Sequence, residues 1–389
     1  MPVRPVEDTL SRRAATMPDS ADRERRRLLG ALLGLPACLQ GCADPSQPAG
    51  GPAGDTSRPA LHTLATAAPD PVDPTDRTDR TDGIGGAAGE DEPDFRHRLY
   101  TPTQITRIGD RYFIVDCWHH RIIHSPRLDV PVARWQALDE DIAGPHSIVS
   151  DGEVYVTEDT GRHGLKVYRE TAPGRFEQVQ YLPDIGLRPH RTRYDARQQQ
   201  FLVVGSGDQS LHAFEVRYGR LVQTRHARVP TLDGEYCRSI TLHQGMIHFM
   251  TERMIVVHRL EEGRLLHPAK HYPLPERWQS SNDLFFLDDQ RALLTSTPGR
   301  ACLLDDLTQL RSDRVQDLSD AFQGTPYYIS QFDGRLWIPE IATPGVAECS
   351  AIRSYPTALA TNGLGAAHTL IHHARTSQAS RERKARLPT

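Results

Sequence analysis

The sequence predicts an all-β domain, a six-bladed β-propeller with four-stranded antiparallel blades, and three observations support this prediction. A short unit, in which a turn and polar residues lead into a strand, recurs six times. Successive units are 43, 44, 48, 44 and 45 residues apart, a spacing typical of propeller blades. Each unit is followed by a hairpin turn and further short apolar segments. The third residues of the six units are Thr103, His146, His190, Arg238, Asn282 and Tyr327.

The segments between the units have the pattern of short strands joined by tight turns. Asp151–Gly152 and Asp333–Gly334 lie between alternating apolar residues, which is a strong signal for a β-hairpin. A third strand is expected at residues 165–168 and a fourth at residues 176–181 of the second repeat. Four short strands in each repeat predict one blade per repeat, and therefore six blades around a central channel.

Residues 95–100 read as a lone strand just before the first unit. We expect this strand to complete the last blade and so to close the ring, because an open sheet edge favours aggregation. The propeller is predicted to occupy residues 94–358. Residues 359–389 become polar again and are predicted to form a disordered C-terminal tail.

Residues 1–41 are predicted to be an export signal. The arginines of Arg25–Arg27 precede a short apolar run that begins at Leu28. This run is too short for a transmembrane helix, which needs roughly 20 apolar residues. It has the length of the hydrophobic part of a signal peptide. The segment Arg25–Leu29 also resembles the twin-arginine export signal, and an ordinary secretion signal is the alternative.

The apolar run ends at Leu39–Cys42, which resembles a bacterial lipobox. The resemblance implies cleavage before Cys42 and lipidation of its thiol. Residues 42–93 are rich in Pro, Gly, Ala, Asp and Thr and show no apolar periodicity, so we expect a disordered tether. The predicted location is the cell envelope, as a membrane-anchored lipoprotein in the periplasm or on the outer face. If the lipobox is not used, the protein is secreted.

Composition and motifs exclude several classes of function. The net charge of -4 and the absence of a Lys/Arg block argue against a nucleic-acid partner. The sequence has no G-x-S-x-G elbow, no Walker loop, no dinucleotide fingerprint and no H-E-x-x-H motif. No two cysteines have metal-finger or C-x-x-C spacing. We expect four cysteines to be buried free thiols, namely Cys117, Cys237, Cys302 and Cys349.

Within the repeats, two segments resemble the NHL repeat. In the first copy an Asp closes the second strand at Tyr112–Asp116, and His120–Ile123 supplies the His-Arg-Ile stretch of the third. The second copy shows the same order at Val154–Asp159 and Leu165–Tyr168. The resemblance implies the propeller fold, and because propellers host unrelated functions it implies no particular activity.

Polar residues are expected to gather where the first strands of the blades begin. In a propeller these strands start at one mouth of the channel, so the third residues of the units should ring that mouth. The next position contributes Gln104, Arg191, Asp283 and Tyr328. The predicted catalytic residues are His146, His190 and Arg238. The predicted ligand-binding residues are Glu158, Glu252, Asn282, Asp283 and Tyr327.

His146 and His190 occupy equivalent places in adjacent repeats, so their side chains should converge. With Glu158 nearby they could hold one divalent ion, Zn or Ca, with a position left for water or substrate. The unit Pro145–Ser147 resembles a zinc-ligand unit of the NHL-type peptide-amidating lyase, which uses three channel histidines where this chain has two. Hydrogen bonding to loops or channel waters, and direct acid–base work, are the alternatives for both histidines.

Two functions of different class remain open at this point. The first is an enzyme or binding protein for a small polar ligand, anionic or sugar-like, at the channel mouth, with hydrolysis, lyase or isomerase chemistry as the reaction classes. Arg238 offers a planar fork suited to an anion, and Tyr327 and Asn282 offer hydrogen bonds to hydroxyls. The second is a non-catalytic propeller that binds a protein of the cell envelope as a scaffold.

Overall fold

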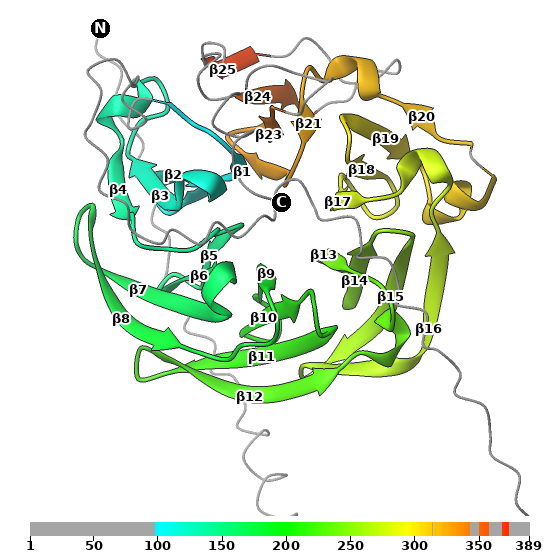
Figure 1. The fold of residues 1–389 in the computed structure, drawn as a ribbon, viewed down its shortest axis with the longest axis horizontal. Coiled ribbons are helices and arrows are strands. Elements are labelled where there is room, and N and C mark those ends of the chain that lie inside the picture. Colours follow the sequence, from blue (N-terminus) through cyan, green and yellow to red (C-terminus); the bar gives the residue numbers. More distant parts are fainter. Residues whose placement is uncertain (1–97, 313, 343–349, 358–367, 373–389) are drawn as a thin grey trace, which may run out of the picture. The chain divides into compact units, whose positions relative to one another are not determined.

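The computed structural model describes residues 98–312, 314–342, 350–357 and 368–372, which form a six-bladed β-propeller (Figure 1). Six antiparallel sheets surround a central axis, and the first strand of each sheet lies nearest that axis (Figure 1). The predicted fold class is therefore confirmed. Cys42 and the rest of the predicted leader and tether lie outside the described residues.

The first three blades follow the chain order. Blade 1 consists of β1 (Pro102–Ile108), β2 (Arg111–Asp116), β3 (Arg121–Ser125) and β4 (Gln136–Asp139). Blade 2 consists of β5 (Ile148–Ser150), β6 (Tyr155–Asp159), β7 (Gly164–Ala172) and β8 (Arg175–Leu182). Blade 3 consists of β9 (Pro189–Asp195), β10 (Gln200–Gly205), β11 (Ser210–Arg217) and β12 (Arg220–Arg228).

The other three blades complete the ring. Blade 4 consists of β13 (Cys237–His243), β14 (Met246–Thr251), β15 (Met254–Glu261) and β16 (Arg264–Pro273). Blade 5 consists of β17 (Ser281–Phe286), β18 (Ala292–Ser296), β19 (Arg300–Leu304) and β20 (Gln316–Asp317). Blade 6 consists of β21 (Thr325–Pro326), β22 (Ser330–Phe332), β23 (Arg335–Ile341), β24 (Ala351–Pro356) and β25 (His368–His372).

Short 3-10 helices connect some of the strands. They are η2 (Cys117–His119), η3 (Val132–Arg134), η4 (Thr160–Arg162), η5 (Pro230–Leu232), η6 (Glu276–Trp278), η7 (Leu307–Ser312) and η8 (Ser319–Ala321). Among the described residues, no helix has the length and apolar character needed to cross a membrane.

The apolar core is divided into layers between neighbouring blades. Phe201 and Phe214 of blade 3, for example, pack against Val156 and Val167 of blade 2. A layer of this kind lies at each of the six junctions, because each sheet has neighbours on both faces. The inner strands of a blade, such as β10, are therefore buried on both faces, whereas outer strands such as β8 are largely exposed.

The closure of the ring differs from the expectation. β25 (His368–His372) is the fourth strand of the last blade, and it lies within residues 359–389, which we expected to be a tail. Residues 98–100 form no strand, and the rest of the proposed strand 95–100 lies outside the described residues. Blades 6 and 1 meet instead through packing: Trp337 and Ile352 contact the layer that contains Leu99 and Ile105.

Side chains at the fourth position of the repeat unit link neighbouring blades near the axis. Gln104 accepts a hydrogen bond from the backbone N–H of Ile148 at 2.7 Å. The Ser147 hydroxyl accepts one from the N–H of Thr192 at 3.1 Å. Asp283 accepts one from the N–H of Ile329 at 2.9 Å. Each link joins a blade to the next one, so a hydrogen-bond acceptor at this position has a structural role.

The three cysteines in the described part of the chain, Cys117, Cys237 and Cys302, are buried, as predicted, and no disulfide joins two of them. Burial raises the pKa of the Cys237 thiol to about 12. Cys349 lies outside the described residues.

Candidate ligand site on the propeller axis

Three of the predicted site residues come together at the axis. The rings of His146 and His190 are stacked with centroids 3.7 Å apart, and the ring of Tyr327 lies 6.2 Å from His146. Each of these side chains is at most 2% exposed, and Arg238 is 4% exposed. The third residues of the units thus gather as the repeat predicts, but they form a buried layer.

The arrangement of the two histidines does not suit a shared metal ion. A metal lies in the plane of an imidazole ligand, along the nitrogen lone pair. The two rings are nearly parallel, with 20° between their planes, so their lone pairs do not meet at one point. Among the described residues, no group of three His, Cys, Asp or Glu side chains has the geometry of a metal site. The divalent ion therefore stays a prediction, and no step below depends on it.

Glu158 and Asn282 are held by protein groups. Glu158 is fully buried and accepts hydrogen bonds from the backbone N–H and the hydroxyl of Ser147, at 2.8 and 2.6 Å. Burial raises the pKa of its carboxyl. Asn282 donates to the carbonyl of Pro326 in the next blade at 3.0 Å and accepts from the Thr297 hydroxyl at 3.1 Å. The contact between Asn282 and Pro326 joins blades 5 and 6 near the axis.

Arg238 and Glu252 form a looser pair at the edge of this layer. Their closest nitrogen and oxygen atoms are 3.7 Å apart, and the Glu252 side chain is 35% exposed. Arg238 also lies over the ring of Tyr236, with 5.5 Å between its guanidinium carbon and the ring centroid. The pair places one cation beside the two histidines, with its carboxylate partner on the solvent side.

Tyr328 of blade 6 reaches across the axis to blades 3 and 4. Its hydroxyl lies 2.8 Å from the carbonyl oxygen of Arg238 and 3.0 Å from Nδ1 of His190. The carbonyl oxygen of His190 lies 3.3 Å away. Burial raises the pKa of Tyr328 well above its usual value, so its phenol is neutral. The side chain therefore spans the centre of the ring and holds the imidazole of His190.

Arg191, the residue after His190, lies against the ring of Tyr328. Its guanidinium carbon is 3.4 Å from the ring centroid, and its side chain is completely buried. None of its three guanidinium nitrogens has a hydrogen-bond acceptor among the described residues. The closest carboxylate oxygen, on Asp283, is 3.8 Å away. A buried guanidinium without acceptors is rare, because it loses its hydration without replacing those hydrogen bonds.

Arg191 shares its nearest carboxylate with a second arginine, Arg193. Asp283 is the carboxylate nearest to both Arg191 and Arg193, which approaches it to 3.5 Å. The oxygens of Asp283 are also occupied, by the Ser239 hydroxyl at 3.1 Å and the Ile329 N–H at 2.9 Å. Burial and the neighbouring Arg191 lower the pKa of Arg193 to about 10, which leaves it protonated at neutral pH. Asp283 is thus the nearest carboxylate of two cations, and the buried Glu158 also acts electrostatically on Arg193.

Sequence reasoning placed Arg191 and Tyr328 beside the site but gave neither a role. The signal that could have singled them out is their position in the repeat. The five other units carry a side chain with an acceptor oxygen at the fourth place, namely Gln104, Ser147, Ser239, Asp283 and Tyr328. Arg191 cannot accept a hydrogen bond. The link between blades 3 and 4 is made instead by Arg193, which donates to the carbonyl of Ile240 at 3.0 Å.

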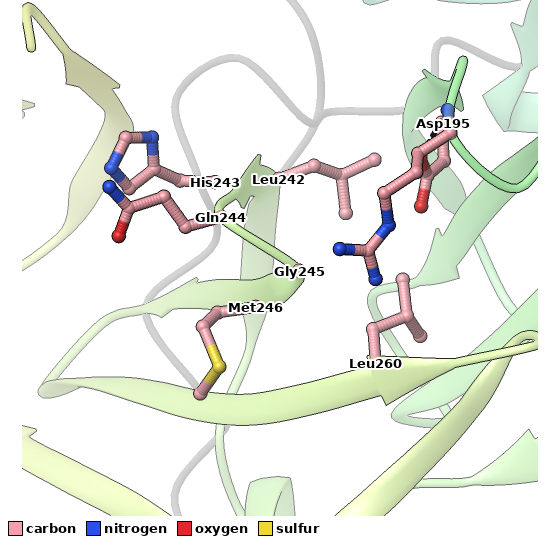
Figure 2. Close-up of a pocket in the computed structure, with 8 residues that line it drawn as sticks. Asp195, Leu242, His243, Gln244, Gly245, Met246 and Leu260 are labelled. Atoms are coloured by element: carbon pink, nitrogen blue, oxygen red, sulfur yellow. Dashed lines mark hydrogen bonds between the residues drawn. The ribbon is translucent and has the colours of Figure 1, made fainter. Parts of the chain in front are cut away.

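A shallow pocket of about 230 Å³ lies away from these residues, at the turn between β13 and β14 (Figure 2). It contains none of the predicted site residues. The carboxylate of Asp195 in its wall already accepts hydrogen bonds from the N–H groups of Arg197 and Gln198. The lining residues are Asp195, Arg197, Leu242, His243, Gln244, Gly245, Met246 and Leu260.

No family model matches the sequence, and no curated protein is similar enough in sequence to count as a relative. Some solved structures resemble the fold. A candidate 6-phosphogluconolactonase from Bacteroides fragilis is 14% identical, with a TM-score of 0.49, and the alignment covers 68% of this chain and 82% of that one. A streptogramin B lyase is 13% identical, with a TM-score of 0.48, and covers 72% of this chain and 85% of its own. At such low identity the likeness concerns the propeller fold.

Proposed function

We propose that the protein binds a small polar anion at the propeller axis and that Arg191 is its anchor. The observation that carries the proposal is the fully buried guanidinium of Arg191, for which no described residue supplies a hydrogen-bond acceptor. Leaving such a group unpaired costs several kcal/mol. A carboxylate or a phosphate offers two oxygens in a geometry that matches the guanidinium fork.

The residues predicted from the sequence surround this anchor. His190 contacts the hydroxyl of Tyr328, whose ring lies under Arg191, and the ring of His146 stacks on His190. Arg238 adds a second cation near the histidines. A ligand with hydroxyl groups, such as a sugar acid, could form hydrogen bonds both to donor and to acceptor groups of these side chains. Hydrolysis, lyase or isomerase chemistry would in addition need a group that exchanges a proton with the ligand.

The place of action in this proposal is the cell envelope. It rests on the signal-like residues 1–41, the lipobox-like segment that ends at Cys42, and the tether that follows. A lipid on Cys42 would hold the propeller at a membrane surface.

The scaffold function remains a second candidate because one observation favours it. The predicted site residues other than Glu252 are buried, so the axis is filled largely by side chains of the protein. In a pure scaffold the guanidinium of Arg191 would bind only ordered water, and no small anion would compete for it.

Thermal unfolding in the presence of small anions tests the proposal. Gluconate, malate, succinate and inorganic phosphate are each added to the wild-type protein and to an Arg191→Met variant. Binding to the native state alone raises its stability by about 2.7 kcal/mol at 100 times the Kd, which is a measurable rise in Tm. We expect at least one carboxylate to raise the Tm of the wild type, and Arg191→Met to abolish that rise.

The control is Arg175→Met, which removes an arginine whose side chain is 76% exposed. This variant should respond to the anions as the wild type does. If no anion raises the Tm, or if Arg191→Met responds like the wild type, the binding function is wrong.

A further inference from the structure

The hydroxyl of Tyr328 has one proton and three neighbouring acceptors. The carbonyl oxygen of Arg238 at 2.8 Å is closer than Nδ1 of His190 at 3.0 Å or the carbonyl oxygen of His190 at 3.3 Å. The shortest of these contacts is the natural destination of the proton. The phenol oxygen then has lone pairs free to accept a hydrogen bond from His190.

This arrangement determines the tautomer of His190. If the phenol donates to the carbonyl of Arg238, Nδ1 of His190 must carry a proton and donate it to the phenol oxygen. Burial, together with the nearby His146 and Arg238, holds the pKa of His190 well below its usual value, so the ring carries only this proton. Its Nε2 is then a bare acceptor, fully buried, with no hydrogen-bond partner among the described residues.

Two buried groups with opposite requirements therefore contact the same side chain, Tyr328. Arg191, which stacks on the face of the Tyr328 ring, lacks acceptors. His190, which contacts the hydroxyl end of the same ring, lacks a donor at Nε2. One small molecule that carries both an anionic group and a hydroxyl would satisfy the two together.

We infer that the ligand is a hydroxy acid, bound by its carboxylate to Arg191 and by a hydroxyl that donates to Nε2 of His190. The inference rests on the proposed function, because it needs an anion at Arg191. Tyr328 is a positioning residue: it supports the guanidinium with its ring and sets the tautomer of His190 with its hydroxyl. A carboxylate without the hydroxyl leaves Nε2 unpaired and binds more weakly.

Malate and succinate make a matched pair of probes, since they differ by one hydroxyl. Calorimetric titration of the wild type should give malate at least about tenfold higher affinity than succinate, equivalent to one well-made hydrogen bond. In Tyr328→Phe the imidazole is free to take the other tautomer. The preference for malate should then fall to about twofold or less, with succinate binding retained. Tyr194→Phe, in the same strand as His190, is the control and should keep the preference.

A spectroscopic measurement keeps the inference testable if Tyr328→Phe does not fold. The ¹⁵N signals of His190, assigned by their loss in His190→Gln, should show a protonated Nδ1 and an unprotonated Nε2 in the wild-type protein. A protonated Nε2 would overturn the inference. So would equal affinity for malate and succinate, both dependent on Arg191, in which case anion binding itself still stands. Absence of any binding would overturn the proposed function and this inference together.

Discussion

The guanidinium of Arg191 in blade 3 lies 3.4 Å above the centroid of the Tyr328 ring in blade 6. Blades 3 and 6 face each other across the ring, so this contact spans the axis of the propeller (Figure 1). The stack supplies a cation–π attraction but no hydrogen-bond acceptor for the guanidinium nitrogens. The positive charge at the axis is therefore only partly compensated by the protein.

Replacing Arg191 by Met should leave the free energy of unfolding of the unliganded protein unchanged or raise it by about 1–4 kcal/mol. The substitution removes a buried cation that makes no hydrogen bond, and Asp283 keeps the Ser239 hydroxyl, the Ile329 N–H and Arg193 as partners. Replacement of a poorly paired buried charge by an apolar side chain of similar size is often neutral or stabilising. Urea unfolding of the two proteins gives the difference.

The matched control is Arg193→Met in the same strand. Arg193 donates to the carbonyl of Ile240 across the junction of blades 3 and 4, so its loss should cost about 1–3 kcal/mol. If Arg191→Met instead lowers the free energy of unfolding more than Arg193→Met does, Arg191 is a structural residue. The proposed binding role is then not supported.

Arg238→Ala should weaken the binding of malate by about tenfold or more and cost little stability, since removing a nearby cation disfavours an anion. Its partner Glu252 is 35% exposed and 3.7 Å away, so solvent can replace the arginine. Calorimetry and urea unfolding of the same preparation separate the two effects. A loss of roughly 3–5 kcal/mol in stability with unchanged binding would instead identify a buried structural ion pair.

Stability should fall as the pH decreases from about 6.5 to about 4. Burial is the main cause that lowers the pKa values of His212 and His248 to about 4, so both rings stay neutral in the folded protein over this range. In the unfolded chain they take up protons below pH 6.5. The unfolded state therefore binds more protons, and the free energy of unfolding decreases with falling pH.

Urea unfolding at several pH values measures this slope. His248→Gln should reduce it, because the folded protein lowers the pKa of this histidine. A slope that is unchanged in His248→Gln would show that this buried histidine does not contribute.

The content of bound metal tests the prediction of a divalent ion at His146 and His190. With the two rings stacked as in the structure, we expect well below one Zn or Ca ion per chain. Elemental analysis of the purified protein provides the number. A stoichiometric ion that disappears in the His146→Ala/His190→Ala variant would support the metal site and would require both rings to turn.

We predict that anchoring at a membrane depends on Cys42, because the lipobox-like segment ends there and a long polar segment follows. Cys42→Ser should move the protein from the membrane fraction to the soluble fraction after cell breakage. If both forms partition alike, the lipid anchor is wrong.

Much of the fold could be predicted because the repeat is regular. The units at Thr103 and Tyr327, at the two ends of the series, carry the same apolar pattern, and their spacing counts the blades. The fourth strand of the last blade was missed because His368–His372 is short and holds only two apolar residues. Such a strand can be identified only from its pairing with a neighbouring strand, which here is β24.

The composition of the site could be predicted only in part. His146, His190 and Tyr327 were expected to converge because they are equivalent in the repeat, and their rings do converge. The contact between Arg191 and Tyr328 joins blades that are far apart in the sequence. It depends on how two long side chains turn across the axis, which no local pattern encodes.

A crystal structure of the wild-type protein grown with malate would test the central claim most directly. We predict one carboxylate of malate within hydrogen-bond distance of the Arg191 guanidinium and the malate hydroxyl facing Nε2 of His190. Ordered water alone around Arg191, or malate bound only elsewhere, such as in the pocket near Leu242 and Met246, would contradict it.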